Sequence, residues 1–202
     1  MRRANVKRKT NETDIQITLN IDGQGKAKID TGIPFLDHML ELFSKHGFFD
    51  LQVKARGDLH VDLHHTNEDI GICLGQAFNQ ALGERAGIRR FGEKTVPMDE
   101  TLVQVRTVVD VSGRPFFNNI KSEKPLEEKD TSAGGYNLSY ARQFLQAMVN
   151  NFPITVHITV LEPGCDTHHL LEAIFKATAK ALDEATQIDP RIKGVPSTKG
   201  TL

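Results

Sequence analysis

The chain has 202 residues, 39% of them apolar and 25% charged, which is ordinary for a soluble globular protein with one core or two closely packed halves. Its 25 basic and 26 acidic residues give a net charge of −1, so the chain offers no global field for holding nucleic acid, and any anion site must be local. No segment approaches the roughly 18 apolar residues of a membrane span, and two cysteines without CxxC spacing favour a reducing, cytoplasmic setting over a disulfide framework.

The first half begins with a basic segment, residues 1–9, which lacks the apolar core of a signal peptide and which we expect to be a solvated arm. Apolar and polar residues alternate over 15–21, which predicts a half-buried strand, and Asp-Gly-Gln-Gly at 22–25 predicts a turn into a hairpin partner. Pro34 then introduces a helix with apolar residues at helical spacing up to Gly47. The remaining elements expected in this half are strands at 51–55 and 59–61 and a helix from 64 to the glycines at 83 and 87.

The second half repeats this order. A β-rich run at 102–111, the turn Ser-Gly-Arg-Pro and a returning strand at 116–120 predict another hairpin. The polar, charged stretch 121–135 is expected to be a mobile loop. The elements expected after it are a helix at 138–149, a strand at 154–160 and a helix that opens at 168.

These elements define two ββαβα-type units, approximately residues 10–92 and 93–188, followed by a polar tail at 189–202. Neither unit has enough apolar surface to fold stably by itself. We therefore expect a single domain over residues 1–202 with an internally duplicated α+β fold, in which sheets pack against helices.

The pattern His-His-x-x-Glu occurs once in each half, at 64–68 and at 168–172. On a helix the first His and the Glu lie on one face, while the second His points about 100° further round the axis, so one motif can face two metals. Neither motif alone closes a metal's ligand shell, which favours two copies, from one chain or from neighbours, sharing ions between them. The alternative is that both motifs are vestiges of a duplicated structural helix.

One further histidine could complete such a shell. His38 lies in the helix before the first motif, although a lone histidine is more often an ordinary residue on a helix surface. The aligned position in the second half is Gln143, and glutamine binds late first-row metals more weakly than imidazole does. The two metal sites could therefore be inequivalent, or water or His157 could take the place of the missing ligand.

Shells rich in histidine with one carboxylate suit Mn, Fe or Zn, and four protein ligands on an octahedral ion would leave room for substrate, which suits manganese. Such an ion can act as a Lewis acid. The tail carries a cluster of hydroxyls and an ammonium group that could bind a phosphate, although a solvated polar tail is an equal alternative. The candidate phosphate ligands are Ser197, Thr198 and Lys199, with Arg90 and Arg114 as additional donors.

Six segments together resemble the imidazoleglycerol-phosphate dehydratase family over nearly the whole chain. They are GIPFLDHML at 32–40, HHTNED at 64–69, ALGERAGIRRFG at 81–92, SGRPFF at 112–117, HHLLEAIFKA at 168–177 and PSTKG at 196–200. The resemblance implies a carbon–oxygen hydro-lyase of histidine biosynthesis that removes water from imidazole glycerol phosphate to give imidazole acetol phosphate. It also implies a duplicated α+β fold, of the ferredoxin-like or ribosomal protein S5 domain 2-like type, and an octahedral homo-oligomer of twenty-four chains.

The resemblance further implies two Mn²⁺ sites per chain, shared between subunits. One ion would be held by His38, His65, His168 and Glu172, and the other by His64, Glu68 and His169. Gln143 stands where the family has the remaining histidine ligand, which puts that second site in question. The strand at 102–111 is also longer than the resemblance suggests, which could signal a bulge or a shifted hairpin.

The mechanistic hypothesis is that metal coordination helps to make an imidazolate, which expels the hydroxyl beside the ring through a diazafulvene-like intermediate. The resemblance points to Glu12 as the base that removes the neighbouring C–H proton, with His46, Glu68 or Glu172 mediating the other proton transfers. Residues expected to contact substrate are Glu12, His38, His46, His64, His65, Glu68, Arg90, Arg114, His168, Lys176, Ser197, Thr198 and Lys199.

Two other functions fit the histidine motifs. A dinuclear metallohydrolase would use a bridging hydroxide to attack a phosphorylated metabolite. A non-catalytic shell protein would use the metals only to clamp subunits together. Neither explains why the whole chain follows the dehydratase order, and we expect no nucleic-acid or membrane partner.

Overall fold

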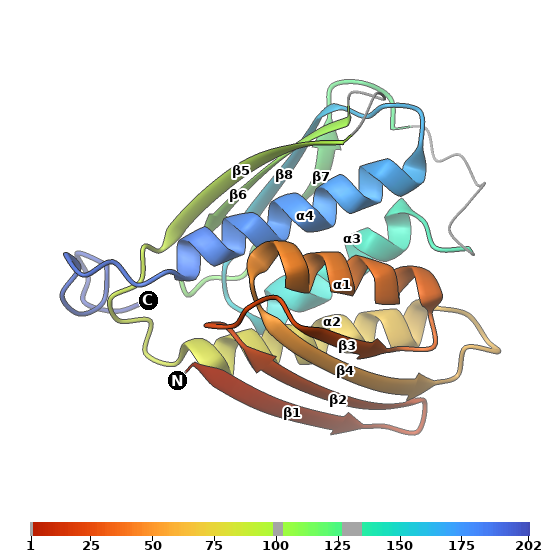
Figure 1. The fold of residues 1–202 in the computed structure, drawn as a ribbon, viewed down its shortest axis with the longest axis horizontal. Coiled ribbons are helices and arrows are strands. Elements are labelled where there is room, and N and C mark those ends of the chain that lie inside the picture. The colour runs from red at the N-terminus through yellow and green to blue at the C-terminus, as the bar shows by residue number, and fades with distance from the viewer. Residues whose placement is uncertain (1, 99–102, 127–134) are drawn as a thin grey trace.

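The computed structural model describes residues 2–98, 103–126 and 135–202, and it is built from two four-stranded sheets with four helices between them (Figure 1). This architecture confirms the predicted α+β class and its duplication. The elements of the first half are β1 (Arg3–Lys9), β2 (Thr13–Asn20), β3 (Ala27–Asp30), α1 (Pro34–Gly47), β4 (Asp50–Gly57) and α2 (His64–Leu82). Those of the second half are β5 (Phe91–Met98), β6 (Val103–Asp110), β7 (Phe116–Ser122), α3 (Leu138–Asn151), β8 (Thr155–Glu162) and α4 (Thr167–Thr186).

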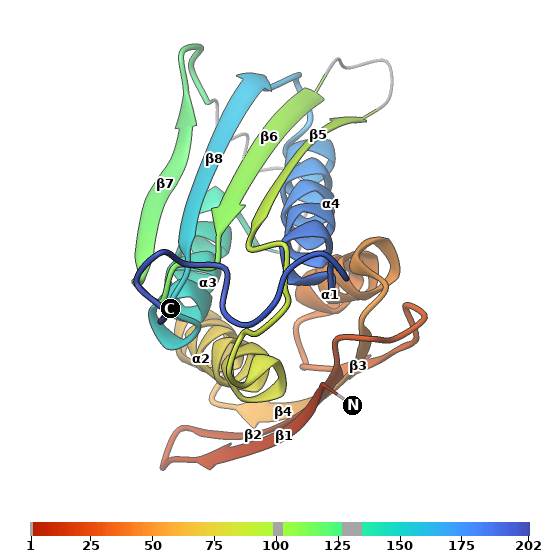
Figure 2. The ribbon, with the colours of Figure 1, turned by 90° about the vertical axis from the view of Figure 1, so that its left-hand side faces the viewer.

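The two sheets have the same topology. The strand orders are β1-β2-β4-β3 and β5-β6-β8-β7, and in each sheet the last strand of the order pairs in parallel with its neighbour while the other pairs are antiparallel. Each sheet packs one face on helices, and the helices of the two halves meet in the middle of the molecule, α2 against α3 and α1 against α4 (Figure 2). The duplication thus places the four helices between the two sheets, which form the outer faces of the molecule.

The predicted N-terminal arm is wrong, because residues 3–9 form strand β1. Val6 pairs with Ile17 of β2 and is buried, while the basic side chains of Arg3, Lys7 and Lys9 are exposed. A strand with lysines and arginines on its outer face has the same composition as a solvated arm. Only the hydrogen bonds to β2 show that this segment is a strand.

Both predicted hairpins are also wrong in their pairing. Strand β2 has β1 on one edge and β4 on the other, so β3 joins the sheet at the far edge of β4, in parallel. In the same way β6 is flanked by β5 and β8, and β7 pairs in parallel with β8. The true hairpins are β1–β2 and β5–β6, which lie one strand earlier in each half than the sequence pattern indicated.

Two smaller expectations had different outcomes. Residues 59–61 form a turn, in which the N–H of Val61 donates to the carbonyl of Asp58 at 2.8 Å, so the strand expected there is wrong. The pairing of β6 with β8 is irregular between Gln104, opposite Glu162, and Val105, opposite Val160, so the extra residue is Leu161 of β8 and not a residue of the 102–111 strand. Most of the predicted mobile loop, residues 127–134, lies outside the described residues, as does the start of the 102–111 run.

The four helices confirm the periodicity analysis, and their buried faces form one continuous core that extends through both halves. Phe78 of α2 lies at the centre of an aromatic cluster that crosses the boundary between the halves, with its ring 5.4 Å from that of Phe152 and 5.0 Å from that of Phe49. Among the described residues no helix is both long and apolar enough to cross a membrane.

Two glycines bring the helices of the two halves unusually close. A Cβ added to Gly71 of α2 would lie 2.6 Å from the carbonyl oxygen of Phe144, and one added to Gly75 would lie 2.3 Å from that of Met148. Any larger side chain at these positions would have to push α3 away. The glycines therefore set the distance between the first histidine motif and α3.

Candidate active site

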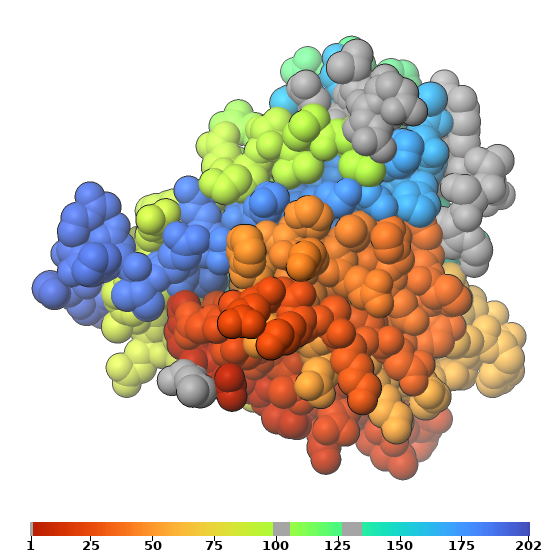
Figure 3. All heavy atoms as spheres, in the orientation of Figure 1, coloured from red at the N-terminus to blue at the C-terminus, as the bar shows by residue number. Residues whose placement is uncertain are grey.

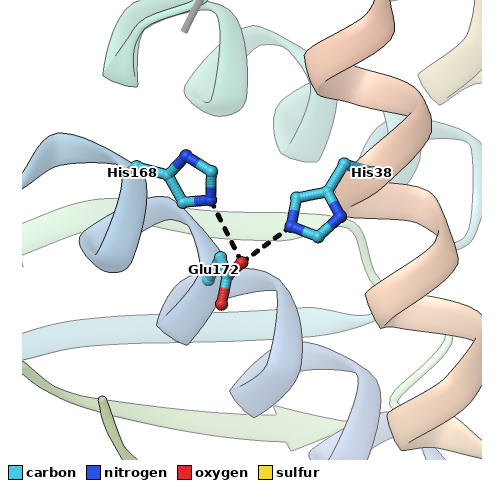
Figure 4. Close-up of side chains that lie close together, drawn as sticks. All are labelled: His38, His168 and Glu172. Carbon is cyan, nitrogen blue, oxygen red and sulfur yellow. Dashed lines mark hydrogen bonds and ion pairs between the residues drawn. The ribbon is translucent and has the colours of Figure 1, made fainter. Parts of the chain in front are cut away.

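The second histidine motif meets His38 at the contact between α1 and α4. The Nε2 atom of His38 lies 2.7 Å from Oε1 of Glu172, and Nε2 of His168 lies 3.1 Å from the same oxygen (Figure 4). All three side chains point to one place, and their ligand atoms lie within 4.8 Å of one another. This convergence of two imidazoles and a carboxylate has the donor set of a first-row transition-metal site.

Local features of the chain position these groups. Pro34 begins α1, and the carboxylate of Asp37 accepts a hydrogen bond from the backbone N–H of Thr31 at 2.9 Å, which fixes the entry into the helix that carries His38. Asp166 caps α4 by accepting from the N–H of His168 at 2.7 Å. The Phe35 ring stands edge-on to the His168 ring, with 5.1 Å between centroids, and limits its orientation.

Glu172 is only 7% exposed, yet it is held ionised. Burial alone would raise its pKa, but the ammonium of Lys176 at 2.6 Å and the ring of His38 outweigh that penalty and lower the pKa of Glu172 to about 2. The carboxylate is therefore a strong ligand at neutral pH. The Nζ atom of Lys176 also lies 3.2 Å from the sulfur of Met98, so the lysine is held between α4 and β5.

His46 lies on α1 two turns beyond His38 and is half-buried. Burial, and then the positive charges of Lys176 and Lys180 on α4, lower the pKa of His46. A neutral imidazole at this position can accept a proton, which suits the role predicted for it.

The first histidine motif lies at the start of α2 and faces α3. His64 and Glu68, four residues apart, bring Nε2 and Oε2 within 3.4 Å of each other. The other ring nitrogen of His64, Nδ1, lies 2.9 Å from Oε1 of Gln143. Gln143 therefore occupies, beside the first motif, a place comparable to that of His38 beside the second.

His65 belongs to a separate cluster at the tip of the β1–β2 hairpin. Its Nδ1 atom lies 2.9 Å from Oδ2 of Asp58 and 3.8 Å from Oε2 of Glu12. The hydrogen bond that the His65 ring donates to Asp58 raises the pKa of His65, and the same bond lowers the pKa of Asp58. Within one chain, His65 is thus not part of the group formed by His38, His168 and Glu172.

The position of Glu12 follows from the hairpin that the sequence did not predict. The Thr10 hydroxyl accepts from the backbone N–H groups of Glu12 and Thr13 and closes the turn. Asp69 of α2 then binds the hairpin, accepting from the hydroxyl of Thr13 at 2.5 Å and from Arg8. These contacts bring Glu12 to His65.

The remaining predicted ligand, His169, faces Asp166, with Nδ1 and Oδ2 4.0 Å apart. The His168 and His169 rings lie nearly perpendicular, with centroids 6.1 Å apart, so the two histidines of the second motif point in different directions. The His64 and His65 rings of the first motif also point in different directions, with centroids 5.8 Å apart. This is the divergence that the helical spacing predicted.

The predicted phosphate ligands gather at the opposite end of the molecule from these histidines. Arg90 binds the carboxylate of Asp110 at 2.7 Å and donates to the carbonyl of Pro196 at 3.0 Å, which holds the tail. Ser197 accepts from the N–H of Lys199 at 3.2 Å in a local turn. The tail ends against Gly113, beside the exposed Arg114, and Thr198 and Lys199 are exposed. In Figures 1 and 3 this tail projects from the far end of α4.

Sequence analysis missed Asp58 and Asn67. Asn67 is buried on the inner face of α2, accepts from the hydroxyl of Tyr136 at 2.9 Å and donates to the carbonyl of Tyr140 at 2.9 Å, so it fixes the first motif to the start of α3. The available signal for Asn67 was its place in the motif, as a short polar residue between His65 and Glu68. No sequence signal identified Asp58, whose contact depends on the turn at 58–61.

The chain is similar to known proteins over its whole length. The family model for imidazoleglycerol-phosphate dehydratase matches residues 31–182. The protein of that name from Geobacillus kaustophilus is 51% identical over 201 residues, which cover 100% of this chain and 99% of the relative. The one from Thermoanaerobacter pseudethanolicus is 54% identical over 202 residues and is covered completely, as is this chain.

Solved structures of the same enzyme share the fold. The crystal structure from Staphylococcus aureus has a TM-score of 0.78 at 34% identity, covering 93% of this chain and 99% of that one. The one from Pyrococcus furiosus has a TM-score of 0.79 at 34% identity, covering 98% of this chain and 100% of that one. The chain therefore belongs to the imidazoleglycerol-phosphate dehydratase family and is a dehydratase of histidine biosynthesis, EC 4.2.1.19.

Proposed function

We propose that this dehydratase binds two Mn²⁺ ions per chain, in sites completed by neighbouring copies of the chain. The observation that carries the proposal is the convergence of His38 and His168 on the ionised Glu172. One ion would be held by His38, His65, His168 and Glu172, and the other by His64, Glu68 and His169. Imidazole nitrogens with one carboxylate fit Mn, Fe or Zn better than Mg or Ca.

Sharing between chains follows from distances within one chain. His65 lies in a different cluster from His38, so a first site of the proposed composition would take His65 from a second copy. The tail is separated from His168 by the length of α4, whose 20 residues extend about 30 Å. One imidazole ring joined to a three-carbon phosphate ester cannot bridge that distance. We infer a homo-oligomer, with an octahedral shell of twenty-four chains as the expected form.

When bound, the metals would hold the imidazole ring of the substrate and stabilise negative charge that develops on it. Loss of water breaks the C–O bond beside the ring and the C–H bond on the next carbon. Glu12, exposed at the hairpin tip, would accept the proton from that C–H bond. His46, Glu68 or Glu172 would mediate the remaining proton transfers, and Lys176 would contact substrate beside Glu172.

The phosphate would bind at the tail end of another copy. Ser197, Thr198 and Lys199 supply hydroxyl, backbone N–H and ammonium donors there, with Arg90 and Arg114 on neighbouring segments. Arg90 is already paired with Asp110, so its part would be to hold the tail as well as to attract the phosphate. Fixing the phosphate far from the reacting carbons restricts the substrate to one orientation.

We also infer a cytoplasmic location. Both cysteines among the described residues are free thiols, Cys73 buried and Cys165 exposed. Exposed unpaired thiols suit a reducing compartment.

Chelation tests the proposal. Protein treated with a chelator should lose its activity on imidazole glycerol phosphate and regain it with Mn²⁺, and product analysis should show water loss without release of inorganic phosphate. Activity that is indifferent to exhaustive chelation would contradict the metal sites. Dissociation of the assembly on chelation, with no turnover by the intact assembly, would instead show that the metals only clamp subunits together.

A further inference from the structure

Asp58 contacts a proposed metal ligand but has no part in the function described so far. It follows β4 directly, and its side chain is 17% exposed. Its Oδ2 atom lies 2.9 Å from Nδ1 of His65, and its Oδ1 atom is buried without a hydrogen-bond partner among the described residues. The His65 ring is therefore the main polar contact of this carboxylate.

The contact determines which ring nitrogen of His65 is available. Since a carboxylate can only accept, a 2.9 Å contact to Nδ1 requires that Nδ1 carry the proton. In the neutral ring Nε2, at the other side, then has the lone pair. Histidines that bind metals commonly donate their second N–H to a carboxylate in this way, which fixes the tautomer and increases the basicity of the ligand nitrogen.

Comparison of the two halves shows that this contact is not a by-product of the helix start. Asp62 and Asp166 are equivalent, and each accepts from the N–H of the first histidine of its motif at 2.7 Å. Glu162, which precedes Asp166 by four residues as Asp58 precedes Asp62, binds Lys124 at 2.5 Å instead of a histidine. A carboxylate at hydrogen-bond distance from Nδ1 is therefore a feature of His65, since Nδ1 of His169, the corresponding histidine of the second motif, lies 4.0 Å from Asp166.

We propose that Asp58 is a positioning residue for His65, which holds the Nδ1–H so that Nε2 faces the metal shared with the second motif of a neighbouring copy. The inference rests on the proposed function, because it requires His65 to be a ligand. In this proposal Asp58 acts through His65 and is not itself a metal ligand.

The test compares Asp58→Ala and Asp58→Asn with wild type and with a control, Asp14→Asn, which changes an exposed carboxylate on β2 of the same sheet. Mn²⁺ affinity is measured by competition with a chelator. Asp58→Ala should weaken one class of site by about 10- to 100-fold and leave the other class unchanged. Asp58→Asn should retain part of the affinity, since its amide oxygen can still accept, and Asp14→Asn should bind as wild type.

A second readout does not depend on metal or activity. In metal-free protein labelled with ¹⁵N-histidine, His65 signals are assigned by their loss in His65→Gln. Wild type should show the tautomer protonated at Nδ1, and Asp58→Ala should shift it toward protonation at Nε2. An unchanged affinity and an unchanged tautomer in Asp58→Ala would overturn the inference. If His65→Gln binds Mn²⁺ as wild type does, the proposed metal site fails, whatever Asp58 does.

Discussion

The 2.7 Å contact between His38 and Glu172 joins two residues that are 134 positions apart, one from each half of the duplicated chain. It shows why the duplication matters: α1 packs on α4, and α3 packs on α2, so each histidine motif lies against a helix of the other half. The four predictions that follow test the consequences of this crossed packing, and each can be measured on the intact protein.

Glu12→Gln should abolish most turnover while leaving the metals and the substrate bound. Oε2 of Glu12 lies 3.8 Å from Nδ1 of His65, so Glu12→Gln removes a proton acceptor and no proposed ligand. We expect kcat to fall by about 10²- to 10⁴-fold, with little change in metal content. Steady-state kinetics and metal analysis check this, and a near-normal kcat would exclude Glu12 as the base.

Metal-free protein should lose stability in acid because of Glu172. Its pKa is lowered from 4.5 to about 2 by Lys176 and His38 against the penalty of burial, so its stabilising effect is complete above pH 4.5 and lost as the pH falls toward 2. The effect should be about 3 kcal/mol in the free energy of unfolding.

Denaturant unfolding between pH 6 and pH 3 measures this effect. Glu172→Gln should be less stable than wild type at pH 6 and should lose much of the pH dependence. Glu41→Gln, which changes an exposed carboxylate on α1, is the matched control and should unfold as wild type does. Parallel pH profiles for wild type and Glu172→Gln would show that the carboxylate is not held ionised by its neighbours.

Gly71→Ala should destabilise the protein and disturb the first motif. The new methyl group would lie 2.6 Å from the carbonyl oxygen of Phe144, so α2 and α3 would have to separate. We expect a loss of about 1–3 kcal/mol in unfolding free energy, together with weaker metal binding at the site that contains His64. Gln80→Ala, at an exposed position of the same helix, should change neither quantity.

Gln143→His should strengthen the second metal site. Gln143 lies 2.9 Å from His64, beside the first motif, and an imidazole is a better ligand for late first-row metals than an amide. The variant should retain a second equivalent of Mn²⁺ at chelator concentrations that remove it from wild type. Gln143→Leu should retain less than wild type. Equal retention by all three proteins would mean that residue 143 has no part in the site.

Much of the fold was predictable from local sequence, and the errors have a common cause. Helical periodicity located all four helices, because each buries one stripe of apolar residues. The predicted strand pairing was wrong because the alternation of apolar residues in β2 identifies a strand but does not show which other strands pair with its two edges. For the same reason the sequence predicts a solvated arm where β1 lies. The division into two repeats and a tail within one domain stays a prediction.

For the site, the sequence indicated the residue types but not their grouping. The i, i+4 spacing predicted the His168–Glu172 and His64–Glu68 pairs, which lie within one helical turn. It could not show that His65 turns to Asp58, because that contact depends on a surface turn. Nor could it place the tail at the far end of α4, which is the strongest argument that a complete site needs more than one chain.

The central claim is that each metal is shared between copies of the chain. The measurement that tests it most directly is a metal count per chain, combined with anomalous scattering at the manganese edge from crystals of the assembled protein. The account predicts two ions per chain, one of them at Glu172 with His38 and His168 from one copy and His65 from another. An ion bound entirely by residues of one chain, or no ion at Glu172, would contradict it.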